Sequence, residues 1–93
     1  MRSYLVELYH PRPVDGGSAA AASRARAEAA AVARAATRVR YVRSLFLLAD
    51  ETCFHEFEAP SADVLERAAQ RVGLHYDRIV EAVARPDERT EDP

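Results

Sequence analysis

The chain has 93 residues, of which 48% are hydrophobic and 30% charged, and its formal net charge is −2. This size allows one domain with one hydrophobic core, and no stretch approaches the roughly 20 apolar residues of a membrane-spanning helix. The single cysteine, Cys53, excludes an internal disulfide, a four-cysteine zinc site and an iron–sulfur cluster bound within the chain. Because no segment has the pattern of a signal peptide, we expect a cytoplasmic protein.

The charges are unevenly distributed along the chain. Residues 24–43 contain six arginines and one acid, whereas residues 44–93 contain five arginines and twelve acids. A nucleic-acid-binding domain usually has a high isoelectric point, and an RNA-recognition sheet needs a basic, aromatic third strand. Residues 53–58, which would form that strand, are acidic instead. The pattern therefore predicts neither a nucleic-acid partner nor a membrane partner.

The first half of the chain reads as a strand followed by a helix. Residues 3–9 are rich in β-forming residues, and they end where Pro11 and Pro13 each remove a backbone donor. A loop over 13–17 leads to Ser18, the expected N-cap of an alanine-rich helix. One side of this helix carries only small residues, which would let it lie close on a sheet. That side comprises Ala22, Ala25, Ala29, Val32 and Ala36.

The second half begins with a predicted hairpin and continues into a second helix. Residues 39–49 form a long β-rich run, which turns at once into a further strand over 53–58. Ser61 is expected to cap an amphipathic helix, and Gly73 supplies the left-handed residue that ends it.

A fourth strand is predicted over 76–84. The resulting order, βαββαβ, indicates an α+β, ferredoxin-like domain over residues 1–85, with a four-stranded antiparallel sheet and two helices on one face. The polar residues 86–93 are expected to form a disordered tail.

Both faces of the predicted sheet are apolar. Since side chains alternate between the faces of a strand, each strand contributes two rows. The rows are Tyr4, Val6 and Leu8 against Leu5, Glu7 and Tyr9 in the first strand, and Val42, Ser44 and Phe46 against Tyr41, Arg43 and Leu45 in the second. A monomer would expose more apolar area than is usual for a soluble protein. We therefore expect two copies to pack face to face as a homodimeric α/β barrel.

The residues with the most suggestive chemistry surround the third strand. In a ferredoxin-like sheet the first and third strands are central neighbours, so Glu7, Arg43 and His55 are expected to converge on the face away from the helices. A carboxylate and an imidazole there could bind a metal ion or move a proton. The alternative is a buried Glu7–Arg43 ion pair with His55 beside it.

The candidate binding residues follow from this arrangement. We expect a small ligand to contact Glu7, Tyr41, Arg43 and His55, and a metal ion to be bound by His55, Glu7, Cys53 or His10. Taken singly, His10 and His75 are typical of surface loops, although a dimer could bring two such histidines together. Cys53 is typical of a buried, inert thiol.

Several short motifs resemble one family of small bacterial proteins. The likeness is most specific in residues 58–81 and covers nearly the whole predicted domain. The motifs are Tyr4-Leu5-Val6-Glu7, Glu58-Ala59-Pro60-Ser61, Leu65, Ala68-Ala69, Gly73-Leu74 and Asp77-Arg78-Ile79 through Glu81. The family has no assigned function beyond a characterised member that binds nickel and forms a ferredoxin-like, dimeric α/β barrel. The resemblance thus implies this fold, a homodimer and nickel as the cofactor.

Two positions depart from the family's pattern. Members often carry an aromatic-Val-His-Ser stretch and a Phe-Cys pair, where this chain has Tyr41-Val42-Arg43-Ser44 and Phe54-His55. Arginine has no lone pair to offer a metal ion, whereas imidazole is a good nickel ligand. If His55 is a ligand, nickel affinity should fall below about pH 6, because the imidazole must be neutral to bind.

Two functions are therefore predicted. The first is a homodimer that binds nickel, another divalent transition metal or a small ligand, and that is not an enzyme. The alternative is a cofactor-independent enzyme of the same dimeric class, such as a monooxygenase, cyclase or isomerase, with a pocket between sheet and helices.

Overall fold

The elements of the computed structural model follow the predicted order. The structure describes residues 1–12 and 18–83, so the predictions for the loop over 13–17 and the tail over 86–93 lie outside the described residues. The elements are β1 (Arg2–Tyr9), α1 (Ser18–Arg34), β2 (Arg40–Leu47), the short 3-10 helix η1 (Leu48–Asp50), β3 (Thr52–Ala59), α2 (Ala62–Arg71) and β4 (Arg78–Ala82).

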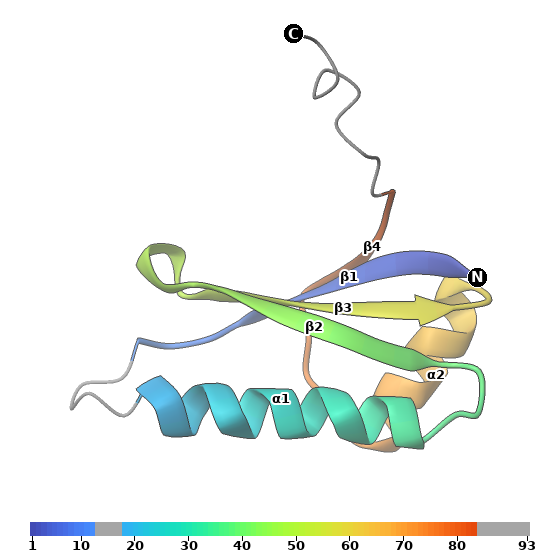
Figure 1. Cartoon of the computed structure of the whole chain (residues 1–93), viewed down its shortest axis with the longest axis horizontal. Coiled ribbons are helices and arrows are strands. Elements are labelled where there is room, and N and C mark those ends of the chain that lie inside the picture. The colour runs from blue at the N-terminus through green and yellow to red at the C-terminus, as the bar shows by residue number, and fades with distance from the viewer. Residues whose placement is uncertain (13–17, 84–93) are drawn as a thin grey trace, which may run out of the picture.

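The four strands form one antiparallel sheet in the order β2-β3-β1-β4, and both helices cover the same face of it (Figure 1). This arrangement confirms the predicted α+β, ferredoxin-like fold, with β1 and β3 as the central neighbours. Within the described ranges, no helix is long and apolar enough to cross a membrane.

Two strands are shorter than the β-rich runs that predicted them. The run over 39–49 ends as a strand at Leu47, because the next three residues turn as η1 into the hairpin. The run from 76 becomes a strand only at Arg78, since the residues after Gly73 cross from α2 to the edge of the sheet.

The ends of α2 are set by local sequence, as predicted. The Ser61 hydroxyl accepts a hydrogen bond from the backbone N–H of Val64 at 3.3 Å, which satisfies a donor that the first helical turn would leave unpaired. Gly73 has a φ of +70°, a left-handed conformation that other residues adopt at a cost. The same pattern that predicts the helix therefore also fixes where it begins and ends.

Replacing Ser61 by alanine is expected to lower the free energy of unfolding by about 1 kcal/mol, because the N–H of Val64 loses its side-chain acceptor. Urea unfolding followed by circular dichroism measures this difference. The matched variant Ser61→Asp keeps an acceptor at the same place and should retain the stability of the original protein. Equal stability of Ser61→Ala and the original protein would contradict the capping role.

The core lies between the covered face of the sheet and the small-residue side of α1. Ala25, Ala29 and Val32 of α1 are buried, in agreement with the predicted small face. They lie above alternate residues of the two central strands, which are likewise buried, and α2 closes the other half of the layer. The buried core of the sheet and α2 comprises Tyr4, Val6, Leu8, Cys53, Phe57, Ala59, Leu65, Ala68 and Ala69.

β2 contains a β-bulge that changes which of its side chains are covered. Its register against β3 shifts between Tyr41 and Arg43, which leaves Val42 as an extra residue. Tyr41 and Ser44 therefore both face the helices, while Arg43 lies on the open face with 64% of its side chain exposed. The prediction that Tyr41 and Arg43 share one row is wrong, because strict alternation assumes a strand without a bulge.

Candidate metal site under the helices

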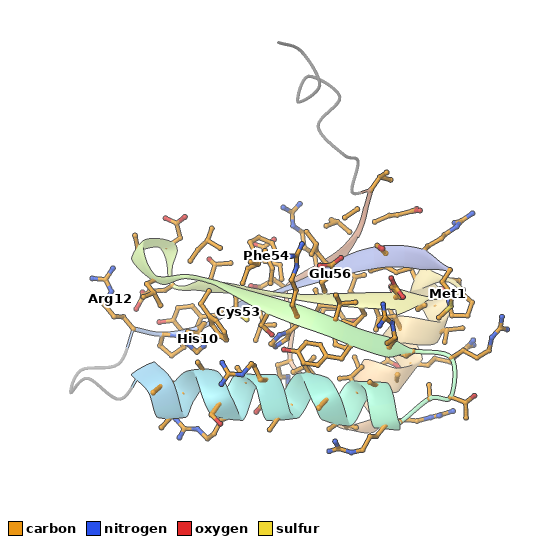
Figure 2. All side chains as sticks on the ribbon, in the orientation of Figure 1. Met1, His10, Arg12, Cys53, Phe54 and Glu56 are labelled. Atoms are coloured by element: carbon orange, nitrogen blue, oxygen red, sulfur yellow. The ribbon has the colours of Figure 1, made fainter. Side chains whose placement is uncertain are left out.

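Cys53 and His55 lie side by side on β3, and both side chains are fully buried, with 0% exposure. They share one face, as alternation predicts, but it is the face under the helices. In Figure 2, Cys53 and His10 point toward α1, whereas Phe54 and Glu56 point away from it. The open face of the sheet therefore carries no part of the Cys53–His55 pair.

The predicted convergence of Glu7, Arg43 and His55 is wrong. Val6, not Glu7, pairs with His55 across the β1–β3 ladder, so Glu7 lies on the opposite face of the sheet from the imidazole. The sequence alone does not give this pairing, because the alternation of side chains relates residues within one strand and not residues of two neighbouring strands.

Glu7 and Arg43 each have a partner other than the predicted one. Glu7 binds Arg78 of the neighbouring β4 at 2.6 Å, and Arg43 binds Glu56 directly across the β2–β3 ladder at 2.8 Å. The alternative prediction of a buried Glu7–Arg43 pair is therefore also wrong. Because both arginines are largely exposed, each pair contributes little to stability.

A chain of polar side chains crosses the covered face and ends at His55. The Tyr41 hydroxyl lies 2.5 Å from the Ser44 hydroxyl, which in turn lies 2.6 Å from Nδ1 of His55. The Cys53 sulfur lies 3.7 Å from Nδ1 and 3.9 Å from Nε2 of the same ring. Sequence reasoning missed Ser44 as a site residue. Its only signal was a hydroxyl within an otherwise apolar part of the second strand.

Burial keeps both members of the Cys53–His55 pair neutral at pH 7. Desolvation lowers the pKa of His55 to about 4, and the nearby charge of His10 acts in the same direction. Desolvation raises the pKa of the Cys53 thiol to about 11. The imidazole is therefore available as a lone-pair donor over the physiological range, whereas the thiol must lose a proton before it can bind a metal ion.

The folded protein is expected to react slowly with a thiol reagent such as Ellman's reagent. With its pKa raised to about 11, the Cys53 thiol has about 100-fold less thiolate at pH 8 than an ordinary cysteine, and burial blocks access as well. The rate should rise to that of a model peptide in denaturant, which serves as the control. Rapid modification of the folded protein would contradict this environment.

His10 is buried, with 7% exposure, and not on the surface as predicted. Its ring packs against Phe46 with the ring centroids 4.9 Å apart, and its backbone N–H donates to the carbonyl of Glu51 at 2.8 Å. The backbone pairing thus continues one residue beyond β1 and carries His10 under the sheet. His75 is exposed, as predicted.

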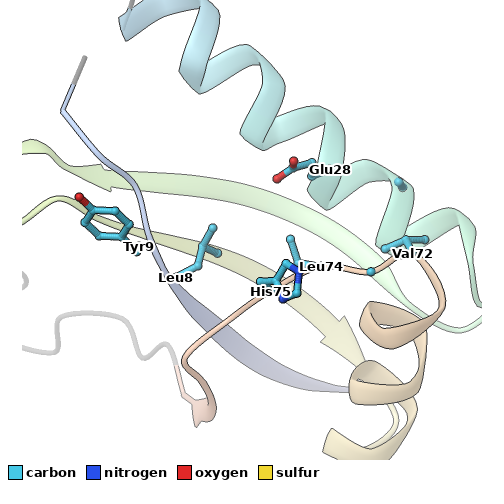
Figure 3. Close-up of a pocket in the computed structure, with 8 residues that line it drawn as sticks. Leu8, Tyr9, Glu28, Val72, Leu74 and His75 are labelled. Carbon is cyan, nitrogen blue, oxygen red and sulfur yellow. The ribbon is translucent and has the colours of Figure 1, made fainter. Parts of the chain in front are cut away.

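Two hollows open beside α1 near the end of β1. The larger, of about 300 Å³, lies between α1, β1 and the connection from α2 to β4, with Glu28 and His75 among its lining residues (Figure 3). The smaller, of about 210 Å³, is lined by His10 and Arg24 and shares Glu28 with the first. Neither hollow is lined by the Cys53–His55 pair.

In the part of the chain that the structure describes, no three His, Cys, Asp or Glu side chains are placed to hold one metal ion. Two donors do meet. A thiolate and an imidazole bound to one tetrahedral ion would lie about 3.5 Å apart, from metal–ligand bonds of about 2.3 and 2.0 Å. The 3.7 and 3.9 Å between the Cys53 sulfur and the His55 nitrogens are close to this value. Thiolate and imidazole are the donor types that borderline transition ions accept, and these two would be the protein ligands of such an ion.

A family model described as nickel responsive protein, SCO4226-like, matches residues 4–82. The chain belongs to this family. The matched range runs from the third residue of β1 to the end of β4 and so includes both helices and all or most of each strand. Membership confirms the family resemblance that the sequence motifs indicate, and it relates the chain to a nickel-responsive group.

A solved relative agrees with this assignment at the level of the fold. The crystal structure of SCO4226 from Streptomyces coelicolor A3(2) is similar with a TM-score of 0.62 and 19% sequence identity, and the likeness covers 90% of this chain and 99% of that one. No curated protein matches the chain. At this identity, the solved relative supports the ferredoxin-like fold and leaves the site to be argued from the chain's own residues.

Proposed function

We propose that this member of the nickel-responsive family is a homodimer that binds a divalent transition ion, nickel first, through Cys53 and His55. The observation that carries the proposal is the approach of the Cys53 sulfur to both ring nitrogens of a neutral imidazole, at 3.7 and 3.9 Å. Sulfur and imidazole donors suit nickel, copper and zinc, whereas carboxylates suit magnesium and calcium. Glu7 has no part in this site, since it faces the other side of the sheet.

His10 is the candidate for a further ligand. Its ring packs against Phe46, which pairs with Cys53 across the β2–β3 ladder, and its charge lowers the pKa of His55. His10 also lines the hollow of about 210 Å³ beside α1, so it is the candidate ligand that this hollow reaches. A metal ion needs such a route, because Cys53 and His55 are themselves out of contact with solvent.

The proposed homodimer rests on the open face of the sheet. Leu45 and Leu47 are exposed there, and Leu5 and Phe54 are only half-buried. The charges that separate these apolar side chains are already neutralised within the chain by three ion pairs of this face, Glu7–Arg78, Arg43–Glu56 and Arg40–Glu58. An identical face is therefore a suitable partner, because it brings apolar area without an unpaired charge.

Calorimetric titration of nickel into protein without a histidine tag tests the metal proposal. We expect binding in the original protein and a loss of at least about tenfold in affinity in each of Cys53→Ser and His55→Gln, since each removes one of two donors. His75→Gln, which changes an exposed histidine, is the matched control and should bind normally. Absence of binding in the original protein, or equal binding by both site variants, would refute the proposal.

The pH dependence of binding differs from that predicted for a free imidazole. Because the pKa of His55 is lowered to about 4, protons compete with the metal ion for the imidazole only below about pH 4, and not already below pH 6. The Cys53 thiol, with its pKa raised to about 11, must instead release one proton for each ion bound. Affinity should therefore fall about tenfold for each unit of pH below neutrality, and Cys53→Ser should remove this slope.

The larger hollow favours a second candidate function, the binding or turnover of a small molecule. Its volume of about 300 Å³ is at the lower end of ligand pockets, and Glu28 and His75 supply groups able to transfer protons. Thermal shifts against a panel of small organic acids and amines test it, with Glu28→Gln as the variant. A ligand whose shift survives in Glu28→Gln would not be using this hollow's carboxylate.

A further inference from the structure

Tyr41 and Ser44 are three residues apart in β2, and yet both reach the covered face. In a regular strand, residues three apart point to opposite faces of the sheet. The extra residue Val42 removes this conflict by shifting the register between Tyr41 and Arg43. β-bulges re-aim side chains in this way and are frequent beside functional sites. Without the bulge, only one of the two hydroxyls could lie on the side of His55.

The bulge also keeps a charge out of the core. If β2 were regular with Tyr41 facing the helices, Arg43 would face them too and would be buried without a carboxylate partner on that side. In the observed register, Arg43 pairs with Glu56 on the open face instead. One irregularity thus delivers two hydroxyls to the covered face and removes a guanidinium from it.

The two hydroxyls form a hydrogen-bonded chain that can satisfy either tautomer of the neutral His55 ring. A hydroxyl can donate one hydrogen bond and accept others. Ser44 can therefore donate to Nδ1 of His55 while it accepts from Tyr41, or accept from a protonated Nδ1 while it donates to Tyr41. In both cases Nδ1 is occupied. The Cys53 sulfur lies 3.7 Å from Nδ1 and 3.9 Å from Nε2, and among the described side chains it is the only hydrogen-bond partner of Nε2.

We propose that Ser44, brought to the covered face by the Val42 bulge and supported by Tyr41, is a positioning residue that holds Nδ1 of His55 and leaves Nε2 as the donor beside the Cys53 sulfur. A histidine that binds metal through Nε2 carries its proton on Nδ1 and donates it to an outer partner, which fixes the ring. Ser44 supplies that partner at 2.6 Å. The consequence for nickel rests on the proposed function, whereas the orientation of the ring does not.

The test combines two measurements on Ser44→Ala. Nitrogen-15 NMR of the metal-free protein reports which ring nitrogen of His55 is hydrogen-bonded, and we expect the Nδ1 resonance to move when Ser44 is removed. Nickel titration should show an affinity lowered by about 10- to 100-fold, as for other outer-shell partners of ligating histidines. A merely structural serine would change stability without moving the Nδ1 resonance.

Three further variants complete the design. Ser44→Thr keeps the hydroxyl and should restore both the resonance and the affinity, whereas Ser3→Ala removes a serine of β1 outside the chain of hydroxyls and should change neither. Tyr41→Phe keeps the Ser44 hydroxyl but removes the hydroxyl that supports it, so it should shift the Nδ1 resonance less than Ser44→Ala does. If Ser44→Ala does not fold, Tyr41→Phe tests the inference in its place.

The two proposals fail in different ways. An unmoved Nδ1 resonance in folded Ser44→Ala, or in Tyr41→Phe if Ser44→Ala does not fold, would overturn the positioning role. A protein that binds no nickel, but whose His55 resonance responds to Ser44→Ala, would overturn the proposed function and retain the positioning of the ring.

Discussion

In the proposed homodimer, a glutamate in place of Leu45 is expected to convert the dimer into a monomer. Leu45 is 46% exposed in the single chain and lies opposite Phe54 on the open face of the sheet. In a two-fold interface the substitution occurs twice, and each buried, unpaired carboxylate costs several kcal/mol. At about 1.4 kcal/mol for each factor of ten, the dissociation constant should rise by at least about 1,000-fold.

Light scattering coupled to size-exclusion chromatography at micromolar concentration measures this change. Arg26→Glu introduces the same side chain on the exposed side of α1, away from the open face, and should leave the dimer intact. If the original protein is already a monomer under these conditions, the barrel assembly is wrong. The metal proposal would survive that result, because Cys53 and His55 come from one chain.

Acid is expected to destabilise the protein through His55, with the loss complete near pH 4. The unfolded chain binds a proton at this histidine near pH 6.5, whereas the folded chain, with the pKa of His55 lowered to about 4, does so only at lower pH. Between these values the unfolded state holds more protons, so stability falls as the pH falls. The difference corresponds to about 2 to 3 kcal/mol between pH 7 and pH 4.5.

Urea unfolding at the two pH values, in the original protein and in His55→Gln, isolates this contribution. The variant should lose stability at neutral pH but show a smaller further loss in acid, since glutamine does not titrate. A hydrogen bond from Arg40 lowers the pKa of Glu58, which also favours the folded state at higher pH. The original protein and His55→Gln both retain this pair, so its contribution cancels in the comparison. An equal acid-dependent loss in both proteins would show that His55 is not the group responsible.

Local sequence determined most of the fold of this protein. The period-2 rows predict the strands, the small-residue stripe predicts how α1 lies on the sheet, and Ser61 and Gly73 mark the ends of α2. Each of these signals acts within a few residues, so it can be read without knowledge of distant contacts. The same alternation correctly places Cys53 and His55 on one face of β3.

Only the tertiary structure decided whether the face that carries Cys53 and His55 is covered by the helices or open. Alternation within a strand leaves open which row is covered and which residue lies across the ladder, and one bulge at Val42 reverses the assignment for half of β2. The pairing of Arg43 with Glu56, the burial of His10 and the contact of Ser44 with His55 all depend on residues at least 11 positions apart. Such contacts follow from the register between strands, where backbone pairing and the cost of burying Arg43 jointly select the arrangement.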